Sequence, residues 1–122
     1  MTEIHNEIFI EDLEVEASVG IYDHEKAAKQ TLILSACIHY MDGKTFNQDD
    51  IHETLNYEII INIINNTAQA HHFNLIESLA ETIAAKILEI EDTHYVEIEI
   101  RKPSVLGSAI KGILGIRIKR GR

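Results

Sequence analysis

Four side chains in this sequence are of types that could bind a ligand or move a proton, and the first is Glu77. It stands in segment 73–88, FNLIESLAETIAAKIL, whose apolar residues recur at the i, i+3 and i+4 spacing of one packed helical face. Asn74 could cap this helix, which would put Glu77 three residues later, where a capping box places its acid. From this segment alone, Glu77 is either part of a helix cap or a carboxylate that faces a ligand.

The second candidate, Lys102, is notable for its position at the end of a predicted strand. In segment 94–102, HYVEIEIRK, the apolar residues share one parity, and Lys102 falls on that same parity. Pro103 follows and ends the strand, since proline has no N–H to donate to a sheet. The Lys102 ammonium should therefore point where the core-facing side chains point, and it either extends past the rim of the core or lines a cavity.

Glu25 and Tyr57 complete the set, and each has an ordinary structural explanation. Glu25 lies beside Asp23 in the turn GIYDHEKAAK, and acids in such turns are usually solvated. Tyr57 lies near the start of a predicted helix that Thr54 or Asn56 could cap, where a tyrosine commonly packs half-buried. Neither residue identifies a site by itself.

Metal and nucleophile chemistry have no comparable signature. The only cysteine is Cys37, so an intrachain disulfide is impossible. His71 and His72 are adjacent and point apart on most backbones, and no HExxH or paired-cysteine spacing occurs. The sequence contains neither a glycine-rich phosphate loop nor a GxSxG nucleophile elbow. We therefore expect no metal site.

The elements that must position these residues follow from hydrophobic periodicity. The pattern predicts strands 7–19 and 30–40, then helices 49–68 and 73–88, then strands 94–102 and 112–120. In the first strand the apolar parity changes at Glu11-Asp12, which predicts a bulge or bend. Short connections favour antiparallel pairing, so the expected fold is α+β, a four-stranded antiparallel sheet with two helices on one face. Such a sheet has two open edges, and we expect an oligomer that closes them.

Each predicted helix should bury one face against the sheet. The apolar positions of the first helix are Leu55, Ile59, Ile60, Ile63 and Ile64. Those of the second helix are Leu75, Ile76, Leu79, Ala80, Ile83, Ala84, Ile87 and Leu88.

Length and composition fit one soluble globular domain over residues 1–122, with 45% hydrophobic residues. The acidic N-terminus and short apolar runs predict neither a signal peptide nor a membrane span, and the single cysteine suits a reducing cytoplasm. The net charge of −9 argues against a nucleic-acid partner. The basic segment 101–122 fits a solvated last strand, because Arg117 and Lys119 alternate with isoleucines.

Four short motifs occur together in an order that resembles one enzyme family. They are GIYDHE in the first turn, TLNY before the first helix, FNLIESLAETIA at the second helix and IRKP at the end of the third strand. With this order and spacing, the chain resembles the dihydroneopterin aldolases of folate biosynthesis from about residue 6 to residue 120. The resemblance implies the ββααββ tunnelling fold, in which the sheets of several subunits join into an oligomeric barrel. It also implies tetrameric rings stacked as an octamer.

The resemblance further implies a reaction and roles for particular residues. The family cleaves 7,8-dihydroneopterin into 6-hydroxymethyl-7,8-dihydropterin and glycolaldehyde. This retro-aldol step uses no metal, Schiff base or cofactor, because the pterin ring accepts the electrons. By similarity, Glu77 anchors the pterin through two N–H groups, with help from the backbone at Ile76. Lys102 looks like the acid/base lysine of the family, and Glu25 resembles the acid that partners it and binds the substrate side chain.

By the same resemblance, each site takes residues from a second subunit. Tyr57 corresponds to a tyrosine that approaches from the neighbouring subunit, contacts the pterin and assists proton transfer. Leu55 and Asn56 would line the same wall of the site.

Three alternatives remain open at this stage. Dihydroneopterin triphosphate 2′-epimerase shares the fold and much of the site, and the segments IHYMDGK and DDIHETLNY resemble it too. Such an enzyme needs cations for the triphosphate, and Lys111 is the obvious candidate. A non-catalytic pterin-binding homologue would not need Glu25, Tyr57, Glu77 and Lys102 together. A zinc-dependent pterin synthase of the same fold is disfavoured, because no set of histidines has ligand spacing.

Overall fold

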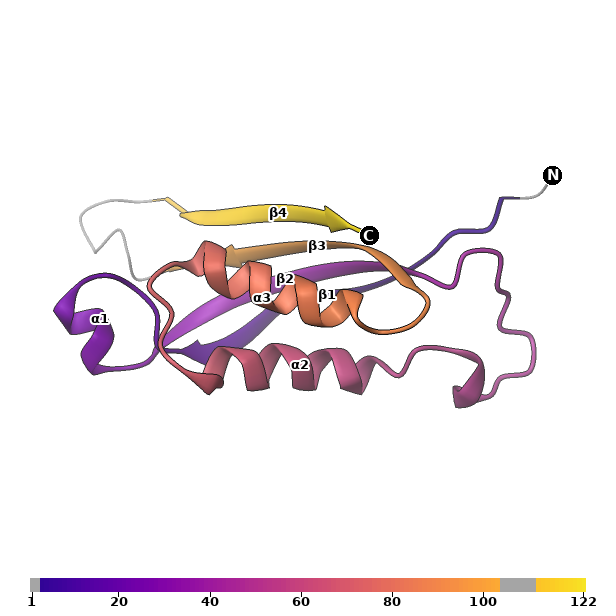
Figure 1. Cartoon of the computed structure of the whole chain (residues 1–122), viewed down its shortest axis with the longest axis horizontal. Coiled ribbons are helices and arrows are strands. Elements are labelled where there is room, and N and C mark those ends of the chain that lie inside the picture. The colour runs from indigo at the N-terminus through magenta and orange to yellow at the C-terminus, as the bar shows by residue number, and fades with distance from the viewer. Residues whose placement is uncertain (1–2, 104–111) are drawn as a thin grey trace.

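The fold is an α+β arrangement of one sheet and two long helices (Figure 1). The computed structural model describes residues 3–103 and 112–122. In chain order its elements are β1 (Asn6–Ala17), α1 (Asp23–Ala27), β2 (Gln30–Tyr40), the 3-10 turn η1 (Ile51–Glu53), α2 (Tyr57–Ala70), α3 (Ile76–Leu88), β3 (Thr93–Arg101) and β4 (Gly115–Gly121). The four strands pair antiparallel in the order β1-β2-β3-β4, and α2 and α3 cover one face, as predicted.

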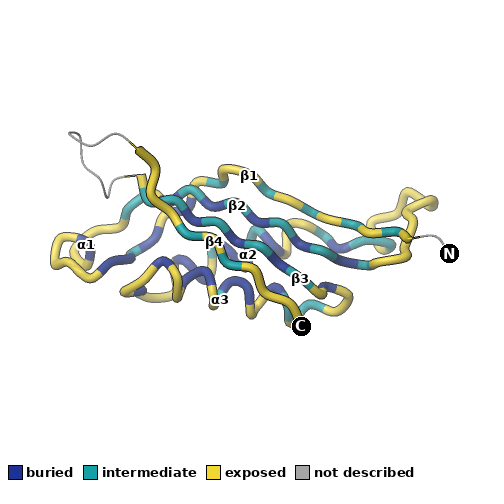
Figure 2. Tube along the Cα trace, turned by 90° about the horizontal axis from the view of Figure 1, so that it is seen from above, coloured by how far each residue is buried: buried dark blue, intermediate teal, exposed yellow. Residues whose placement is uncertain are grey.

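The hydrophobic core lies between this face of the sheet and the two helices (Figure 2). Along β2 every second residue is buried, because successive side chains of a strand point to opposite faces. Fully burying one large aliphatic side chain contributes about 1.5–3 kcal/mol, so this layer fixes the positions of the strands and helices. The largest fully buried side chains are Leu32, Leu34, Ile38, Ile60, Ile64, Leu79, Ile83, Ile87, Ile98, Ile100, Val15 and Val19.

A bulge in β1 keeps its apolar residues on the core face. The register between β1 and β2 shifts between Ile10 and Leu13, and Asp12 adopts the left-handed conformation with φ of 57°. Ile10 lies opposite Ala36 and Leu13 lies opposite Leu34, so residues of different parity on β1 share one face. The predicted change of parity at this point is confirmed.

The first long helix begins later than predicted. The prediction placed its start at residue 49, but α2 starts at Tyr57, because the preceding residues form the separate turn η1. In that turn the Asp50 carboxylate accepts a hydrogen bond from the His52 backbone N–H at 2.9 Å. Of the two candidate caps, Thr54 and Asn56, it is Asn56 that caps α2, by accepting a hydrogen bond from the backbone N–H two residues later at 3.0 Å.

Three further expectations change at the surface. Ile59 and Leu75 were expected on packed helical faces, but they are 46% and 48% exposed. The segment after Gly20, expected to be only a turn, contains the five-residue helix α1. β4 begins at Gly115, three residues later than expected.

The last two strands carry opposite charges on the face away from the helices. Lys119 Nζ lies 3.8 Å from Glu97 Oε1, and Arg117 Nη2 lies 3.4 Å from Glu99 Oε1, both between residues that are paired in the ladder. Exposed pairs of this kind contribute at most about 1 kcal/mol each. The basic last strand is therefore a solvated, paired surface, as predicted. No helix among the described residues has the length and apolar content needed to cross a membrane.

Candidate active site

A buried ion pair joins Lys102 to Glu25 at the end of the sheet. The Lys102 Nζ lies 2.5 Å from Glu25 Oε2, and the two side chains are 11% and 8% exposed. Lys102 is the first residue after β3, and its backbone N–H donates to the carbonyl of Leu114 at 2.9 Å, which holds it beside the start of β4. The Lys102 ammonium therefore points inward, as its parity predicted.

Glu25 is buried, although acids in turns of this kind are usually solvated. Its Oε1 accepts a hydrogen bond from the Tyr22 backbone N–H at 3.4 Å. Gln30 Nε2 donates to Glu25 Oε2 at 3.4 Å and to the Val19 carbonyl at 2.9 Å. Gly20, with φ of 129°, packs directly on the carboxylate, and a Cβ at this position would overlap it. The turn therefore folds around the Glu25 carboxylate and leaves no space for a larger residue at position 20.

The electrostatics of this pair keep Glu25 ionised. The hydrogen bond from Lys102 lowers the pKa of the Glu25 carboxyl below its ordinary value, and the hydrogen bonds from Gln30 and Tyr22 act in the same direction. Burial disfavours the charged form and opposes this shift, but its effect is outweighed. The pair places an anionic oxygen and an ammonium side by side, and such a pair can hold and pass protons.

His72 connects the Glu25 turn to the loop that leads into α3. Its Nε2 lies 2.8 Å from the Gly20 carbonyl, and its Nδ1 lies 2.6 Å from Ser18 Oγ. Since a carbonyl can only accept, Nε2 carries the proton and donates to Gly20, and Nδ1 accepts from the Ser18 hydroxyl. Next to it, the Gly20 N–H donates to the Phe73 carbonyl at 2.9 Å, and the Phe73 N–H donates to the Ser18 carbonyl at 3.0 Å. These four bonds hold the two loops together.

Glu77 lies close to this junction, in the first turn of α3. Phe73 forms an isolated parallel bridge with Val19, and α3 begins three residues after Phe73. Glu77 is exposed, and no hydrogen bond or ion pair joins its side chain to another residue of the described chain. The carboxylate is thus open to solvent near the Glu25 turn.

The predicted cap of this helix is wrong. The N-cap residue is Leu75, whose side chain cannot cap, and not Asn74, because the backbone stays extended through Leu75 (φ −126°, ψ 139°). Glu77 is therefore not at the capping-box position. Ile76, which starts the helix, is buried at 8% exposure. Of the two explanations for Glu77, the structure removes the capping box.

Tyr57, Leu55 and Asn56 lie at the opposite end of α2. The helix runs from Tyr57 to Ala70, and the end at Ala70 leads directly into the His72 junction (Figure 1). At 1.5 Å per residue, its 14 residues span about 20 Å. Tyr57 is 57% exposed, whereas Leu55 is buried. Within one chain, the structure thus brings together Lys102, Glu25 and the start of α3, but not Tyr57 and its neighbours.

Sequence reasoning missed two residues that position Glu25. Gln30 was noted only as the start of a strand, and His72 only as one of two adjacent histidines. His72 and the Gly20 carbonyl are 52 residues apart, so no local pattern could have revealed their contact. Lys111, considered as a cation for a triphosphate, lies outside the described residues.

Fold and site together define an α+β domain with a buried lysine–carboxylate pair and an open carboxylate at one end of its sheet, an arrangement suited to acid–base chemistry. The comparisons with known proteins show the family to which the chain belongs. A family model described as dihydroneopterin aldolase matches residues 8–118. The chain belongs to the dihydroneopterin aldolase family, which confirms the resemblance of its motifs.

Individual relatives agree with this assignment. The dihydroneopterin aldolase of Escherichia coli strain K12 is 29% identical over 114 residues, covering 93% of this chain and 92% of the relative. The dihydroneopterin triphosphate 2′-epimerase of the same strain is 28% identical over 95 residues, covering 78% and 79%. The crystal structure of E. coli dihydroneopterin aldolase in complex with neopterin superposes with a TM-score of 0.86 at 28% identity, covering 95% of this chain and 99% of that chain.

Proposed function

We propose that this chain is a lyase of folate biosynthesis that cleaves 7,8-dihydroneopterin into 6-hydroxymethyl-7,8-dihydropterin and glycolaldehyde. The observation that carries the proposal is the buried contact of 2.5 Å between Lys102 and Glu25 at the end of the sheet. An aldolase relative that matches over 93% of the chain supports the choice of substrate.

The reaction breaks the bond between C1′ and C2′ of the substrate side chain. When the 2′-hydroxyl loses its proton, C2′ becomes the aldehyde carbon of glycolaldehyde. The electron pair of the broken bond moves to C1′ and into the C6=N5 unit of the pterin. A proton delivered to C1′ then completes the hydroxymethyl product. The enzyme must therefore remove one proton from oxygen and deliver one to carbon, which is general acid–base catalysis.

In this proposal the Lys102–Glu25 pair serves both proton transfers. The ionised Glu25 accepts hydrogen bonds from the substrate hydroxyls and stabilises the Lys102 ammonium. The ionised Glu25 accepts the proton of the 2′-hydroxyl through a water molecule. The Lys102 ammonium delivers a proton to C1′ by the same route, and the proton held by Glu25 then passes across their contact to the neutral lysine, so that the pair ends each cycle in its starting state.

Glu77 would anchor the pterin ring. The aminopyrimidinone edge of a pterin offers two adjacent N–H donors, and an ionised carboxylate offers two acceptors in matching geometry. Glu77 lies in the first turn of α3, where the helix dipole favours a negative charge. The backbone around buried Ile76 would add to this pocket.

The remaining site residues would come from a second copy of the chain. Tyr57 is exposed at the far end of α2 and does not reach the Lys102–Glu25 pair of its own chain. We therefore propose that Tyr57, with Leu55 and Asn56, completes the site of a neighbouring subunit. A cytoplasmic homo-oligomer built of tetrameric rings, stacked as an octamer, would also pair the open edges of β1 and β4.

Epimerisation at C2′ is the second candidate, and the 28% identity to the triphosphate epimerase favours it. If the aldehyde turns over and recombines with C1′ before it leaves, the same residues invert C2′ without net cleavage.

The experiment is incubation with 7,8-dihydroneopterin and, separately, with its triphosphate, followed by chromatography of the products. Release of glycolaldehyde from dihydroneopterin supports the aldolase, and inversion of the triphosphate without release supports the epimerase. Absence of both products would overturn the proposal. The control is the Lys102→Met variant, which keeps the length of the side chain and removes the ammonium. Circular dichroism must show that it is folded under the assay conditions, because loss of the buried ion pair is also expected to destabilise the chain.

A further inference from the structure

The face of the sheet opposite the helices carries a cluster of metal-ligating side chains that the proposed reaction does not use. Cys37 and His39 are two residues apart on β2, so they point to the same face. Glu7 lies on β1 directly opposite His39 in the ladder. The side chains of Cys37, His39 and Glu7 therefore meet at one place, because the Cβ atoms of residues paired across two strands lie about 5 Å apart.

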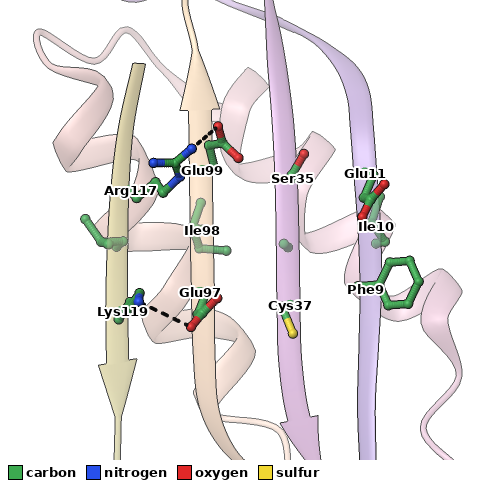
Figure 3. Close-up of a pocket in the computed structure, with 12 residues that line it drawn as sticks. Phe9, Ile10, Glu11, Ser35, Cys37, Glu97, Ile98, Glu99, Arg117 and Lys119 are labelled. Atoms are coloured by element: carbon green, nitrogen blue, oxygen red, sulfur yellow. Dashed lines mark hydrogen bonds and ion pairs between the residues drawn. The ribbon is translucent and has the colours of Figure 1, made fainter. Parts of the chain in front are cut away.

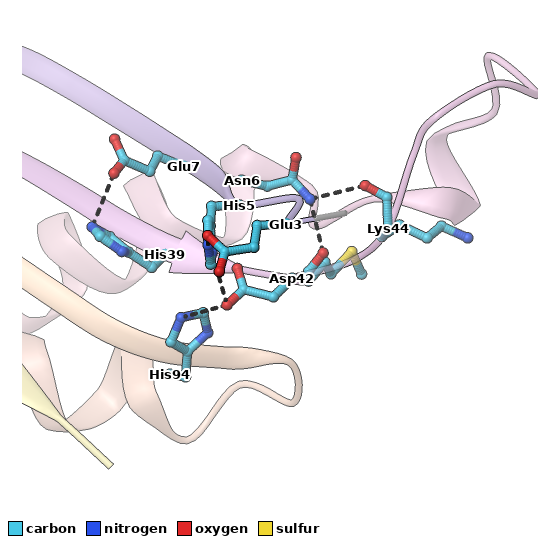
Figure 4. A network of polar contacts seen from close by, with 9 residues as sticks. Glu3, His5, Asn6, Glu7, His39, Asp42, Lys44 and His94 are labelled. Carbon is cyan, nitrogen blue, oxygen red and sulfur yellow. Dashed lines mark hydrogen bonds and ion pairs between the residues drawn. The ribbon is translucent and has the colours of Figure 1, made fainter. Parts of the chain in front are cut away.

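The distances between the ligand atoms fit a bound metal. Glu7 Oε1 lies 3.2 Å from His39 Nε2 (Figure 4), and Cys37 Sγ lies 3.6 Å from Glu7 Oε2. One nitrogen, one sulfur and one carboxylate oxygen of the three residues all lie within 4.8 Å of one another. Zinc bound at about 2.0–2.3 Å holds tetrahedral ligands about 3.3–3.8 Å apart. Each Glu7 contact is already close to this spacing, but the two contacts use different oxygens, so side-chain rotation must bring the three ligand atoms together around the metal.

The surroundings hold these ligands in place and favour a cation. The His39 ring packs edge-to-face on Tyr95, with centroids 4.8 Å apart. Cys37 faces the hollow shown in Figure 3, where Glu97 is its partner on β3. The Glu7 carboxylate, which contacts Cys37 Sγ, and the Glu97 carboxylate on the paired strand thus place negative charge beside the thiol, and a bound cation would offset it.

We propose that Glu7, Cys37 and His39 form a binding site for one Zn²⁺ ion, with water in the fourth position. A set of one thiolate, one imidazole and one carboxylate is typical of zinc among the common divalent metals. The site lies on the helix-free face of the sheet, away from the Lys102–Glu25 pair, and takes no part in the proposed cleavage. It would tie the edge strand β1 to β2.

The sequence alone predicts no metal site, because none of its spacings between histidines or between cysteines is typical of one. The pattern Cys-x-His on a strand, with an acid on the paired strand, depends on the register of the sheet. Two of the three ligands were visible in the segment SACIHY, but Glu7 could be assigned to them only from the ladder.

The test is a titration of the untagged chain with Co²⁺, a spectroscopic substitute for Zn²⁺. We expect a near-ultraviolet charge-transfer band from a cobalt–thiolate bond, saturating at one metal per chain and removed by added Zn²⁺. The Cys37→Ser variant should lose the band, and His39→Ala should bind at least about tenfold more weakly. His52→Ala is the matched control, because His52 also contacts a carboxylate, Asp50, at 2.9 Å on the surface, and it should bind like wild type.

Several results would overturn the site. The first is the absence of a thiolate band in the wild-type chain, and the second is wild-type metal affinity in His39→Ala. The third is an equal loss of metal affinity in His52→Ala and His39→Ala, which would mean adventitious surface binding only. Circular dichroism must first show that each variant is folded. If Cys37→Ser does not fold, Glu7→Gln with the same readout takes its place, and it too should bind at least about tenfold more weakly.

Discussion

The Lys102–Glu25 pair can be tested by a double-mutant cycle with Glu25→Gln, Lys102→Met and the double variant. Both side chains are about nine-tenths buried, at 8% and 11% exposure, so bulk water screens the pair little. Removing one partner leaves the other charge buried and unpaired, which typically costs about 3–5 kcal/mol of stability. Each single variant should therefore be strongly destabilised.

The double variant distinguishes a real pair from two separate contacts. Additive costs would total about 6–10 kcal/mol, but a neutral glutamine and an apolar methionine leave no buried charge behind. We therefore expect the double variant to lie within about 2 kcal/mol of the wild type, which is less destabilised than either single variant.

Urea denaturation at near-neutral pH measures these free energies, at one fixed protomer concentration because oligomerisation adds to apparent stability. If the loss of unfolding free energy in the double variant equals the sum of the two single losses to within about 0.5 kcal/mol, the buried pair is refuted. Turnover is read on the same proteins. Lys102→Met should lower it about 10²–10⁴-fold, and the double variant should remain inactive although its stability returns.

The same pair predicts a dependence of stability on acid. Lys102 lowers the pKa of Glu25 below 4.5, so its stabilisation is fully present above 4.5 and is lost as the pH falls through the lower value in the folded state. The urea midpoint of the wild type should therefore fall in acid towards that of Glu25→Gln. If the difference between the urea midpoints of wild type and Glu25→Gln stays constant from neutral to strongly acid pH, the lowered pKa of Glu25 is contradicted.

Four further predictions follow from the site. Glu77→Gln should weaken pterin binding by about 1.5–3 kcal/mol with little change in melting temperature, and a sharp fall in melting with unchanged titration would restore a structural role. Mixed rings of Tyr57→Ala and Lys102→Ala subunits should recover roughly a quarter of wild-type turnover. With random assembly, about one half of the sites have an intact lysine, and about one half of those also have an intact tyrosine from the neighbour. Native mass spectrometry must show that the rings are mixed, and no recovery in such rings would exclude a shared site. His72→Phe should lower kcat by about 10²-fold through a displaced carboxylate, with pterin affinity retained and partial rescue by His72→Gln; an unchanged kcat would remove this role. Gly20→Ala should destabilise the fold by about 1–3 kcal/mol through backbone strain and also lower turnover, and wild-type stability would show that the turn has room for a Cβ.

Strand parity was sufficient to predict much of the fold. β2 alternates strictly and β3 does so from Val96 onward, so their buried faces and the inward direction of Lys102 could be inferred from spacing. The change of parity in β1 likewise indicated the bulge near Asp12. The first residues of the two long helices could not be predicted in this way. The apolar pattern before α2 continues through η1, but Asp50 accepts a backbone hydrogen bond there and closes a separate turn. At α3 the chain stays extended through Leu75, because Phe73, just before it, pairs with the segment 18–20 that follows β1.

The site was predictable only where its chemistry coincided with local pattern or family resemblance. The family resemblance implied a role for Glu25, but its turn alone is typical of a solvated acid. Its burial depends on Lys102 from the far end of the chain and on the absence of a side chain at Gly20. The contact between His72 and Gly20 joins residues 52 positions apart, which only the folded chain brings together. Long-range contacts of this kind leave no periodic trace in a sequence.

The way Glu25 is held argues that the pair exists for chemistry and not for stability. A buried ion pair is often no more stabilising than apolar residues of similar size. Here the carboxylate occupies the space that a side chain at Gly20 would fill, and Gln30 donates a hydrogen bond to it. His72 fixes the turn through its hydrogen bond to the Gly20 carbonyl. A stabilising contact does not need a carboxylate oxygen placed so closely, but proton transfer does, because it depends on positions within a hydrogen-bond length. The recovered stability of the inactive double variant would separate these two roles directly.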